Sequence, residues 1–163
     1  MSRVRLFNVE WNATNVTTLQ QTITALRASG GLDAQGNNTA MASVTGTVNV
    51  SSIGSELLDE INTYFPGLVV CVNGVNNYLV RYLNYDNSVL YKYVVTAGAN
   101  AINPVTSNLI TAPEKPGETE GYGYAFKDFG TLPTNINSNV SLVAQYDPAY
   151  RVRFMNDDVA YNT

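Results

Sequence analysis

The chain has 163 residues, about the length of one domain, which is enough to bury a core without a metal or disulfide bonds. Only 13% of the residues are charged, and 13 acidic against 9 basic residues give a net charge of −4, which argues against a basic, nucleic-acid-binding surface. The chain contains no histidine, which excludes Ser-His-Asp and Cys-His catalysis, His-based zinc sites and imidazole proton transfer.

The sequence contains no targeting or membrane-spanning segment. No apolar run approaches the roughly 20 residues that a spanning helix needs, and residues 1–5 lead into a polar segment instead of a signal peptide. We therefore expect synthesis in the cytoplasm and no membrane insertion. The single cysteine, Cys71, lies in the apolar run 68–72 and is expected to be a core residue without a disulfide. No glycine-rich phosphate-binding motif is present, so no cofactor is expected.

The first part of the chain predicts two helices and two strands. Leu19, Ile23 and Leu26 recur at helical spacing, and Gly30-Gly31 supplies a stop. Residues 44–50 alternate apolar and polar, as a strand does, and Ser51 and Ser52 are candidate caps of the next helix.

That second helix has an apolar face and ends at Pro66-Gly67, before a strand over 68–72. Its apolar residues are Leu57, Leu58, Ile61 and Phe65. A strand, a helix and a strand predict parallel pairing through a right-handed crossover. The 24-residue spacing of the two strand starts also suits a leucine-rich-repeat-like unit. We therefore expect residues 1–74 to form a small α/β segment.

All 11 tyrosines fall at or after position 64, and the second part reads as β-rich. Residues 78–84 and 89–95 predict a hairpin around the turn 85–88. We expect its tyrosine- and valine-bearing face to be the core, because in the similar segment 150–156 the other face carries Arg151 and Arg153, and burying an unpaired cation is costly. The half-covered residues of that other face, Leu79, Leu83 and Leu90, are a candidate interaction surface.

After a long loop or crossover over 97–121, two further strands are expected over 121–129 and 140–146. Four strands with one long crossover predict a small β-grasp-like unit over 75–148. The fold class expected for the whole chain is α+β.

An internal repeat marks a second unit. Residues 78–86 (YLVRYLNYD) recur at 150–158 (YRVRFMNDD), with five of nine positions identical. Residues 149–163 are thus expected to begin a second repeat, which either continues beyond Thr163 or is completed by another subunit.

Several motifs in the second part together resemble the Listeria-Bacteroides repeat, the β-grasp B-repeat of internalins. They are Tyr78–Asn84, Val89–Tyr91, Ala112–Pro116, Tyr124–Phe129, Leu132–Ile136 and Ala144–Tyr146. The family commonly has Gly-Trp where this chain has Asp128-Phe129.

The arrangement is also similar to tail, baseplate or fibre proteins of tailed bacteriophages, through Gly31–Asn38 followed by the strand Thr45–Val48. This resemblance implies a non-enzymatic virion protein, a fibre, tail, baseplate or capsid-decorating component, with other virion proteins as partners and homo-oligomers expected. The alternative is an adhesin or receptor-binding module that recognises a host receptor or glycan.

Candidate sites are few. Residues 33–38 offer oxygen ligands but lack the acids of a calcium loop, so a turn is expected, and Asp147 with Asp157-Asp158 is a weak cation candidate. Glu56 and Glu60 lie one helical turn apart on what is expected to be a solvated face, so neither a glycosidase nor another enzyme is expected. A recognition role would fall on loop tyrosines, named here as Tyr85, Tyr122 and Tyr161.

Overall fold

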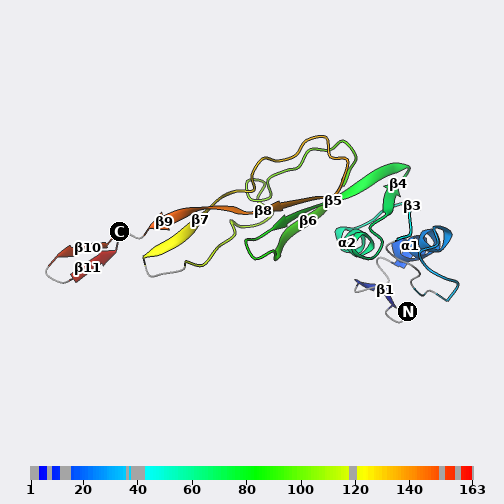
Figure 1. The fold of residues 1–163 in the computed structure, drawn as a ribbon, viewed down its shortest axis with the longest axis horizontal. Helices are drawn as coiled ribbons and strands as arrows, with labels where there is room; N and C mark the ends of the chain where they lie inside the picture. The colour runs from blue at the N-terminus through cyan, green and yellow to red at the C-terminus, as the bar shows by residue number, and fades with distance from the viewer. Residues whose placement is uncertain are drawn as a thin grey trace. The chain divides into compact units, whose positions relative to one another are not determined.

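A computed structural model describes residues 4–6, 9–11, 16–35, 37, 43–117, 121–150, 153–156 and 159–162 (Figure 1). The chain forms two compact units, each described here by itself. Unit 1 comprises residues 1–80, 92–100 and 134–140, and unit 2 comprises 81–91, 101–133 and 141–163. Two helices and a majority of strands in the described ranges confirm the α+β class. The β-grasp repeat and the boundaries at 74 and 148 stay predictions.

Unit 1 begins its core with helix α1 (Val16–Ala28). Leu19 and Leu26, two turns apart on one face, are both buried. The helix ends where Gly30 takes a left-handed conformation with φ of 80° and the Gly31 N–H donates to the carbonyl of Leu26 at 2.8 Å. The predicted helix and its glycine stop are both confirmed.

The next three elements form the predicted strand–helix–strand unit. Strand β3 (Gly46–Val50) pairs in parallel with β4 (Leu68–Val72), and helix α2 (Ser55–Tyr64) connects them. The cap prediction is wrong, because the N-cap is Gly54 and no side chain caps the helix. The two serines instead tie this loop to α1: Ser51 donates to Gln21 at 2.7 Å, and Ser52 bonds Thr18 at 3.2 Å.

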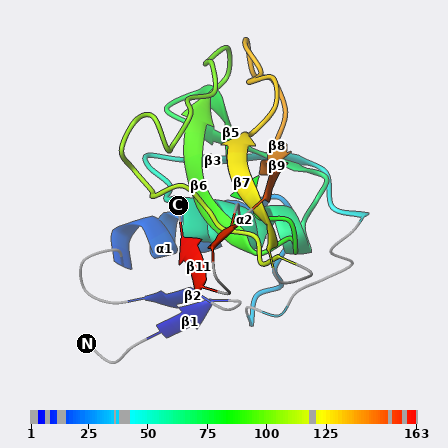
Figure 2. The ribbon, with the colours of Figure 1, turned by 90° about the vertical axis from the view of Figure 1, so that its left-hand side faces the viewer.

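Both helices pack on the same face of the sheet (Figures 1 and 2). The core between them is mainly apolar, and the buried hydroxyl of Thr22 donates to the carbonyl of Thr18 within α1 at 2.8 Å. The strand residues of the core alternate along β3 and β4 as period-two burial requires. Cys71 is buried as predicted, and its thiol donates to the Asn76 side chain at 2.9 Å. The buried cluster is Leu19, Leu26, Leu32, Val48, Val50, Leu57, Leu58, Ile61, Phe65, Leu68, Val70 and Leu79.

A tight hairpin joins β4 to β5 (Val75–Leu83), with Val72 opposite Val75. Asn73 and Gly74 form the two-residue turn, and both have positive φ, 50° and 81°, as a type I′ turn requires. The sequence was divided at this point, yet β4 and β5 belong to one sheet. Its strand order is β3-β4-β5-β6, with β6 at Val89–Thr96, and β8 (Val140–Val143) also pairs with β5.

The predicted hairpin of β5 and β6 is present, but its division into a core face and a half-covered face is wrong in part. Leu79 is 2% exposed and belongs to the core cluster, whereas Val89 on the expected core face is 48% exposed. Val80 and Tyr82 on the expected core face are fully buried. The consecutive residues Leu79 and Val80 are both buried, so both faces of β5 are covered at this point and alternation does not distinguish them.

Unit 2 contains a two-stranded antiparallel ribbon of β7 (Tyr122–Asp128) and β9 (Gln145–Tyr150). The single strand expected over 140–146 is two strands, separated at Ala144, whose N–H donates to the carbonyl of Leu83 at 2.8 Å. The described residues between β6 and β7 contain turns but no helix or strand, which agrees with the expected loop.

Two further pairs of strands are described by their backbone alone. Strand β1 (Val4–Leu6) pairs with β2 (Val9–Trp11), and β10 (Arg153–Asn156) pairs with β11 (Val159–Asn162), both antiparallel. The sequence did not predict β1, β2 or β11, whereas β10 lies within the expected start of the second repeat.

Candidate functional site: an aromatic face on the β7–β9 ribbon

One face of the β7–β9 ribbon is built almost entirely from rings. The antiparallel register places Tyr122 opposite Tyr150, Tyr124 opposite Pro148 and Phe126 opposite Tyr146. Directly opposed residues lie on the same face, and alternate residues of each strand share it. The other face carries small or polar residues such as Gly123, Ala125, Asp147 and Ala149. We call the following set the aromatic face: Tyr122, Tyr124, Phe126, Tyr146, Pro148 and Tyr150.

The rings of the aromatic face contact one another along and across the strands. The centre of the Tyr122 ring lies 5.3 Å from that of Tyr124, with an interplanar angle of 77°. It also lies 5.3 Å from the centre of the Tyr150 ring, with an angle of 59°. Phe126 lies 6.1 Å from Tyr146 in an edge-to-face arrangement. These separations fall in the range that aromatic pairs prefer, so the face is a packed surface and not a set of isolated side chains.

Exposure changes along the aromatic face. Tyr150 is 72% exposed, whereas Tyr122, Tyr124, Phe126 and Tyr146 are half-buried. At the Phe126 end the rings continue into the interior of unit 2 through Phe129, which is buried and lies 5.1 Å from Phe126. One end of the face is therefore anchored in a core, and the other end is open to solvent.

A cation is built into this surface. The Lys115 ammonium lies 4.0 Å from the centre of the Tyr124 ring and 5.6 Å from that of Tyr85. Tyr85 in turn lies 6.5 Å from Tyr146, edge to face. Both ammonium distances are within the reach of cation–π attraction. Lys115 and Tyr85 therefore extend the aromatic face beyond the two strands.

Polar groups fix the orientation of Tyr146. Its hydroxyl donates to Asn84 Oδ1 at 2.5 Å, and Asn84 Nδ2 donates to the carbonyl of Glu114 at 3.1 Å. The pKa of Tyr146 is raised above its usual value, mainly by burial and further by Tyr85 and the Asp86 carboxylate. The hydrogen bond to Asn84 lowers the pKa but does not cancel these effects. The Tyr146 phenol therefore stays neutral at physiological pH.

The structure brings two of the sequence-predicted site residues to this surface, Tyr85 and Tyr122. Leu79 lies in the core of unit 1, and Leu83 and Leu90 are half-buried. Tyr161 lies in β11, where side chains are outside the described part of the structure, and Asp157-Asp158 lies outside the described residues.

Sequence reasoning missed Tyr124, Tyr146 and Tyr150 as one surface. The available signal was the period-two aromatic pattern of residues 122–126, matched by residues 146–150. Neither segment shows the opposite strand, so the register that joins them could not be read from either segment alone.

The other sequence candidates have structural explanations. The Asp33 carboxylate accepts hydrogen bonds from the backbone N–H groups of Gln35 and Asn37, at 2.9 and 2.8 Å, as an Asx-type turn does. Glu56 pairs with Lys92 at 3.2 Å. Glu60 is half-buried, and its Oε2 is buried without a hydrogen-bond partner, so the expectation of a fully solvated helix face is wrong for this residue.

In the described part of the chain, no three Cys, Asp or Glu side chains gather in a group that could hold a metal ion. No helix among the described residues has the length and apolar character to cross a membrane. Comparison of the chain with known protein families, curated proteins and solved structures finds no match.

Proposed function

We propose that this chain is a non-enzymatic structural protein of a bacteriophage particle, which anchors through residues 1–74 and joins neighbouring virion proteins through the aromatic face. The observation that carries the proposal is a two-stranded ribbon with a row of half-buried rings on one face, which ends at the 72% exposed ring of Tyr150. A two-stranded ribbon is marginally stable by itself in water, and exposed clusters of large apolar side chains mark contact sites. A neighbouring subunit that covers the aromatic face would supply the missing burial.

The sequence supports the same proposal from a different direction. The low charge, the internal repeat and the similarity to tail, baseplate and fibre proteins all fit a component of a repetitive assembly. Tyrosine is enriched at the centres of protein interfaces, where its ring is buried and its hydroxyl is hydrogen-bonded.

Incorporation into particles tests the proposal. Particles are assembled in host cells from the Tyr122→Ser/Tyr150→Ser variant, and the amount of this chain per particle is measured by quantitative mass spectrometry. The matched control is Ala125→Ser/Ala149→Ser, which changes the opposite face of the same two strands. We expect incorporation of the tyrosine variant to fall by about tenfold, as loss of a central interface contact does, and that of the control to be unchanged.

Two outcomes would contradict the assembly proposal. One is absence of the wild-type chain from purified particles. The other is normal incorporation of the tyrosine variant.

A specific observation favours a second candidate function, recognition of a glycan or host receptor. The aromatic face combines exposed rings with phenol hydroxyls, and rings of this kind stack on sugars while their hydroxyls hydrogen-bond. Binding to host cells and to an array of neutral glycans is measured for three purified proteins. They are the wild-type chain, the Tyr122→Ser/Tyr150→Ser variant and the Ala125→Ser/Ala149→Ser control. Saturable binding that only the tyrosine variant loses, together with normal incorporation of that variant into particles, would favour recognition over assembly.

A further inference from the structure

Strand β3 is an edge of the unit 1 sheet whose outer backbone groups face away from β4. Within the described residues β3 pairs only with β4. On the side that faces β4, the carbonyl of Val50 accepts a hydrogen bond of 3.2 Å from the N–H of Asn73, the residue after β4. On the other side, the carbonyl of Thr47 accepts a hydrogen bond from the hydroxyl of Ser29, at the end of α1. Because the backbone groups of successive residues alternate in direction, Thr47 and Asn49 direct their N–H and C=O groups to the open side.

Strand β3 has no charged side chain, proline or bulge that would prevent another strand from adding to it. Natural edges are protected by such features or by a helix or loop beside the edge. The sequence of β3 is GTVNV, and its pairing with β4 runs from Gly46 to Val50 without a bulge. Helix α1 lies beside the edge but leaves a groove there, so the outward backbone groups of Thr47 and Asn49 can accept a further strand.

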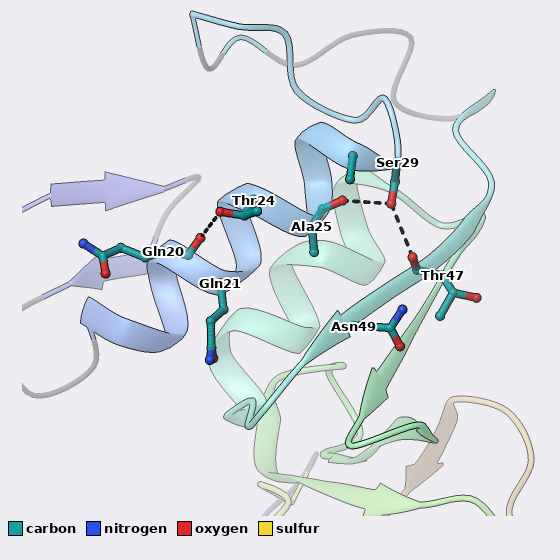
Figure 3. Close-up of a pocket in the computed structure, with 8 residues that line it drawn as sticks. Gln20, Gln21, Thr24, Ala25, Ser29, Thr47 and Asn49 are labelled. Carbon is teal, nitrogen blue, oxygen red and sulfur yellow. Dashed lines mark hydrogen bonds between the residues drawn. The ribbon is translucent and has the colours of Figure 1, made fainter.

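A groove of about 530 Å³ runs between α1 and the open side of β3 (Figure 3). No side chain in its lining is charged. The helix contributes small side chains at Ala25 and Ala28, which leave room for a backbone to approach. A second hollow of about 280 Å³ shares Gln21 and Asn49 and continues past the end of the strand at Gly74. The main groove is lined by Gln20, Gln21, Thr24, Ala25, Ala28, Ser29, Thr47 and Asn49.

The hydrogen bond that crosses the groove does not block it. The Ser29 hydroxyl donates to its own helix at the carbonyl of Ala25, at 2.9 Å, and to the carbonyl of Thr47 at the longer distance of 3.4 Å. A carbonyl oxygen has two lone pairs, so Thr47 can accept a second hydrogen bond from an added strand.

We propose that β3 pairs antiparallel with β3 of a second copy of this chain, so that the unit 1 sheets of two subunits become continuous. A two-fold axis at Val48 places Val48 opposite Val48 of the second copy and Thr47 opposite Asn49. The outward N–H and C=O groups of Thr47 then exchange hydrogen bonds with those of Asn49 across the axis, as a hydrogen-bonded antiparallel pair does.

Two observations favour a second copy as the occupant of this edge. A two-fold interface brings each strand against itself, which suits the uncharged strand β3 because no like charges are opposed. The groove has no charged side chain that would select a charged peptide. The inference goes beyond the proposed function and involves unit 1 alone, so it does not depend on what the aromatic face contacts.

The experiment is sedimentation equilibrium of the full wild-type chain and of Asn49→Pro. Proline at this position removes an outward N–H and leaves the bonds between β3 and β4 in place. We expect the wild type to have twice the mass of one chain, and the dissociation constant of Asn49→Pro to rise by about tenfold or more through loss of symmetry-related hydrogen bonds.

Further variants keep the test decisive if the proline variant does not fold. Asn49→Lys places a charge on the edge and is expected to weaken the dimer, whereas Thr63→Lys, which adds the same charge at an exposed position of α2, is not. Tyr122→Ser/Tyr150→Ser is also expected to leave the dimer intact, which separates this interface from the aromatic face. A monomeric wild type, or a dimer that survives Asn49→Lys, would overturn the inference.

The register is tested by disulfide formation between a chain carrying Thr47→Cys and a chain carrying Asn49→Cys. When the two are mixed and oxidised, the mixed pair is expected to cross-link in preference to either chain with itself. A preference for identical pairs would overturn the Val48 axis.

Discussion

The ring of Phe129 packs edge-on against the ring of Tyr82, with 4.9 Å between their centres and an angle of 69° between their planes. Both side chains are buried in unit 2. Truncation of either residue to alanine is expected to lower the free energy of unfolding by about 3–5 kcal/mol. A double-mutant cycle, measured by urea unfolding, is expected to give a coupling of about 0.5–1.5 kcal/mol, whereas additive effects would contradict a direct ring contact.

The Tyr82 hydroxyl donates a hydrogen bond to the carbonyl of Ile102, which lies in the long loop of unit 2. Tyr82→Phe keeps the ring and removes this bond, so we expect a loss of about 1 kcal/mol in the free energy of unfolding, well below that of Tyr82→Ala. Faster hydrogen exchange confined to the loop around Ile102 would locate the effect. A loss as large as that of the alanine variant would show that the hydroxyl has a greater role than this one bond.

Lys92 lies between two carboxylates of α2, with Nζ 3.0 Å from Asp59 and 3.2 Å from Glu56. Burial alone lowers the pKa of Lys92, but the hydrogen bonds to Asp59 and Glu56 outweigh it and raise the pKa above the ordinary value of 10.5. Asp59→Asn is expected to cost about 1 kcal/mol and Glu56→Gln about 0.3 kcal/mol, because Glu56 is far more exposed.

The same ion pairs predict a pH dependence. Since the pKa of Lys92 is higher in the folded state, its contribution to stability is complete below pH 10.5 and is lost as the pH rises through the folded pKa. The difference in stability between wild type and Lys92→Met should therefore be constant near neutral pH and shrink in alkaline solution. Urea unfolding at a series of pH values measures it, and a difference that grows above pH 10.5 would contradict the assignment.

The turn between β4 and β5 depends on two residues with left-handed backbone conformations. Gly74 has φ of 81°, and no atom lies within 4 Å of the position that an added Cβ would take, so Gly74→Ala tests backbone strain without a clash. We expect it to cost about 1–2 kcal/mol in thermal or urea unfolding. Asn73→Gly, at φ of 50°, is expected to be nearly neutral and serves as the control.

The buried thiol of Cys71 predicts slow chemical modification. Its Sγ donates to the Asn76 side chain, and the residue lies in the interior of unit 1. A thiol reagent that turns yellow when it reacts is expected to modify Cys71 of the native chain only as fast as unit 1 unfolds locally. In denaturant the same reagent is expected to react at once. Rapid reaction of the native protein would contradict the burial.

The helices and strands that the sequence predicted best are those that bury one face in the core and expose the other. Leu19 and Leu26 mark a helix with one apolar face, and Val48 and Val50 mark a strand with one buried face, so periodicity alone finds both. Leu79 shows where this signal fails, because Leu79 and Val80 are both buried and the strand is covered on both faces at this point, whereas Arg151 and Arg153 of the similar segment 150–156 indicate only the opposite face for the core. That choice depends on which elements cover the sheet, which is information from distant segments.

The Asn73-Gly74 hairpin is a turn that the sequence analysis did not predict. Asn-Gly between two apolar runs is a strong local signal for such a hairpin, and the change in composition at the same point says nothing about strand pairing. The aromatic face could be predicted only in halves, because Tyr122 and Tyr150 are brought together by pairing across a long loop.

The two ends of the unit 1 sheet are chemically unlike. Strand β3 has no charged side chain, whereas β6, at the opposite end of the strand order, carries Lys92, which forms ion pairs with Asp59 and Glu56. A two-fold contact through β3 uses the same edge of both copies, so that edge is exhausted once two copies have met. Association through unit 1 is therefore self-limiting and does not propagate into filaments.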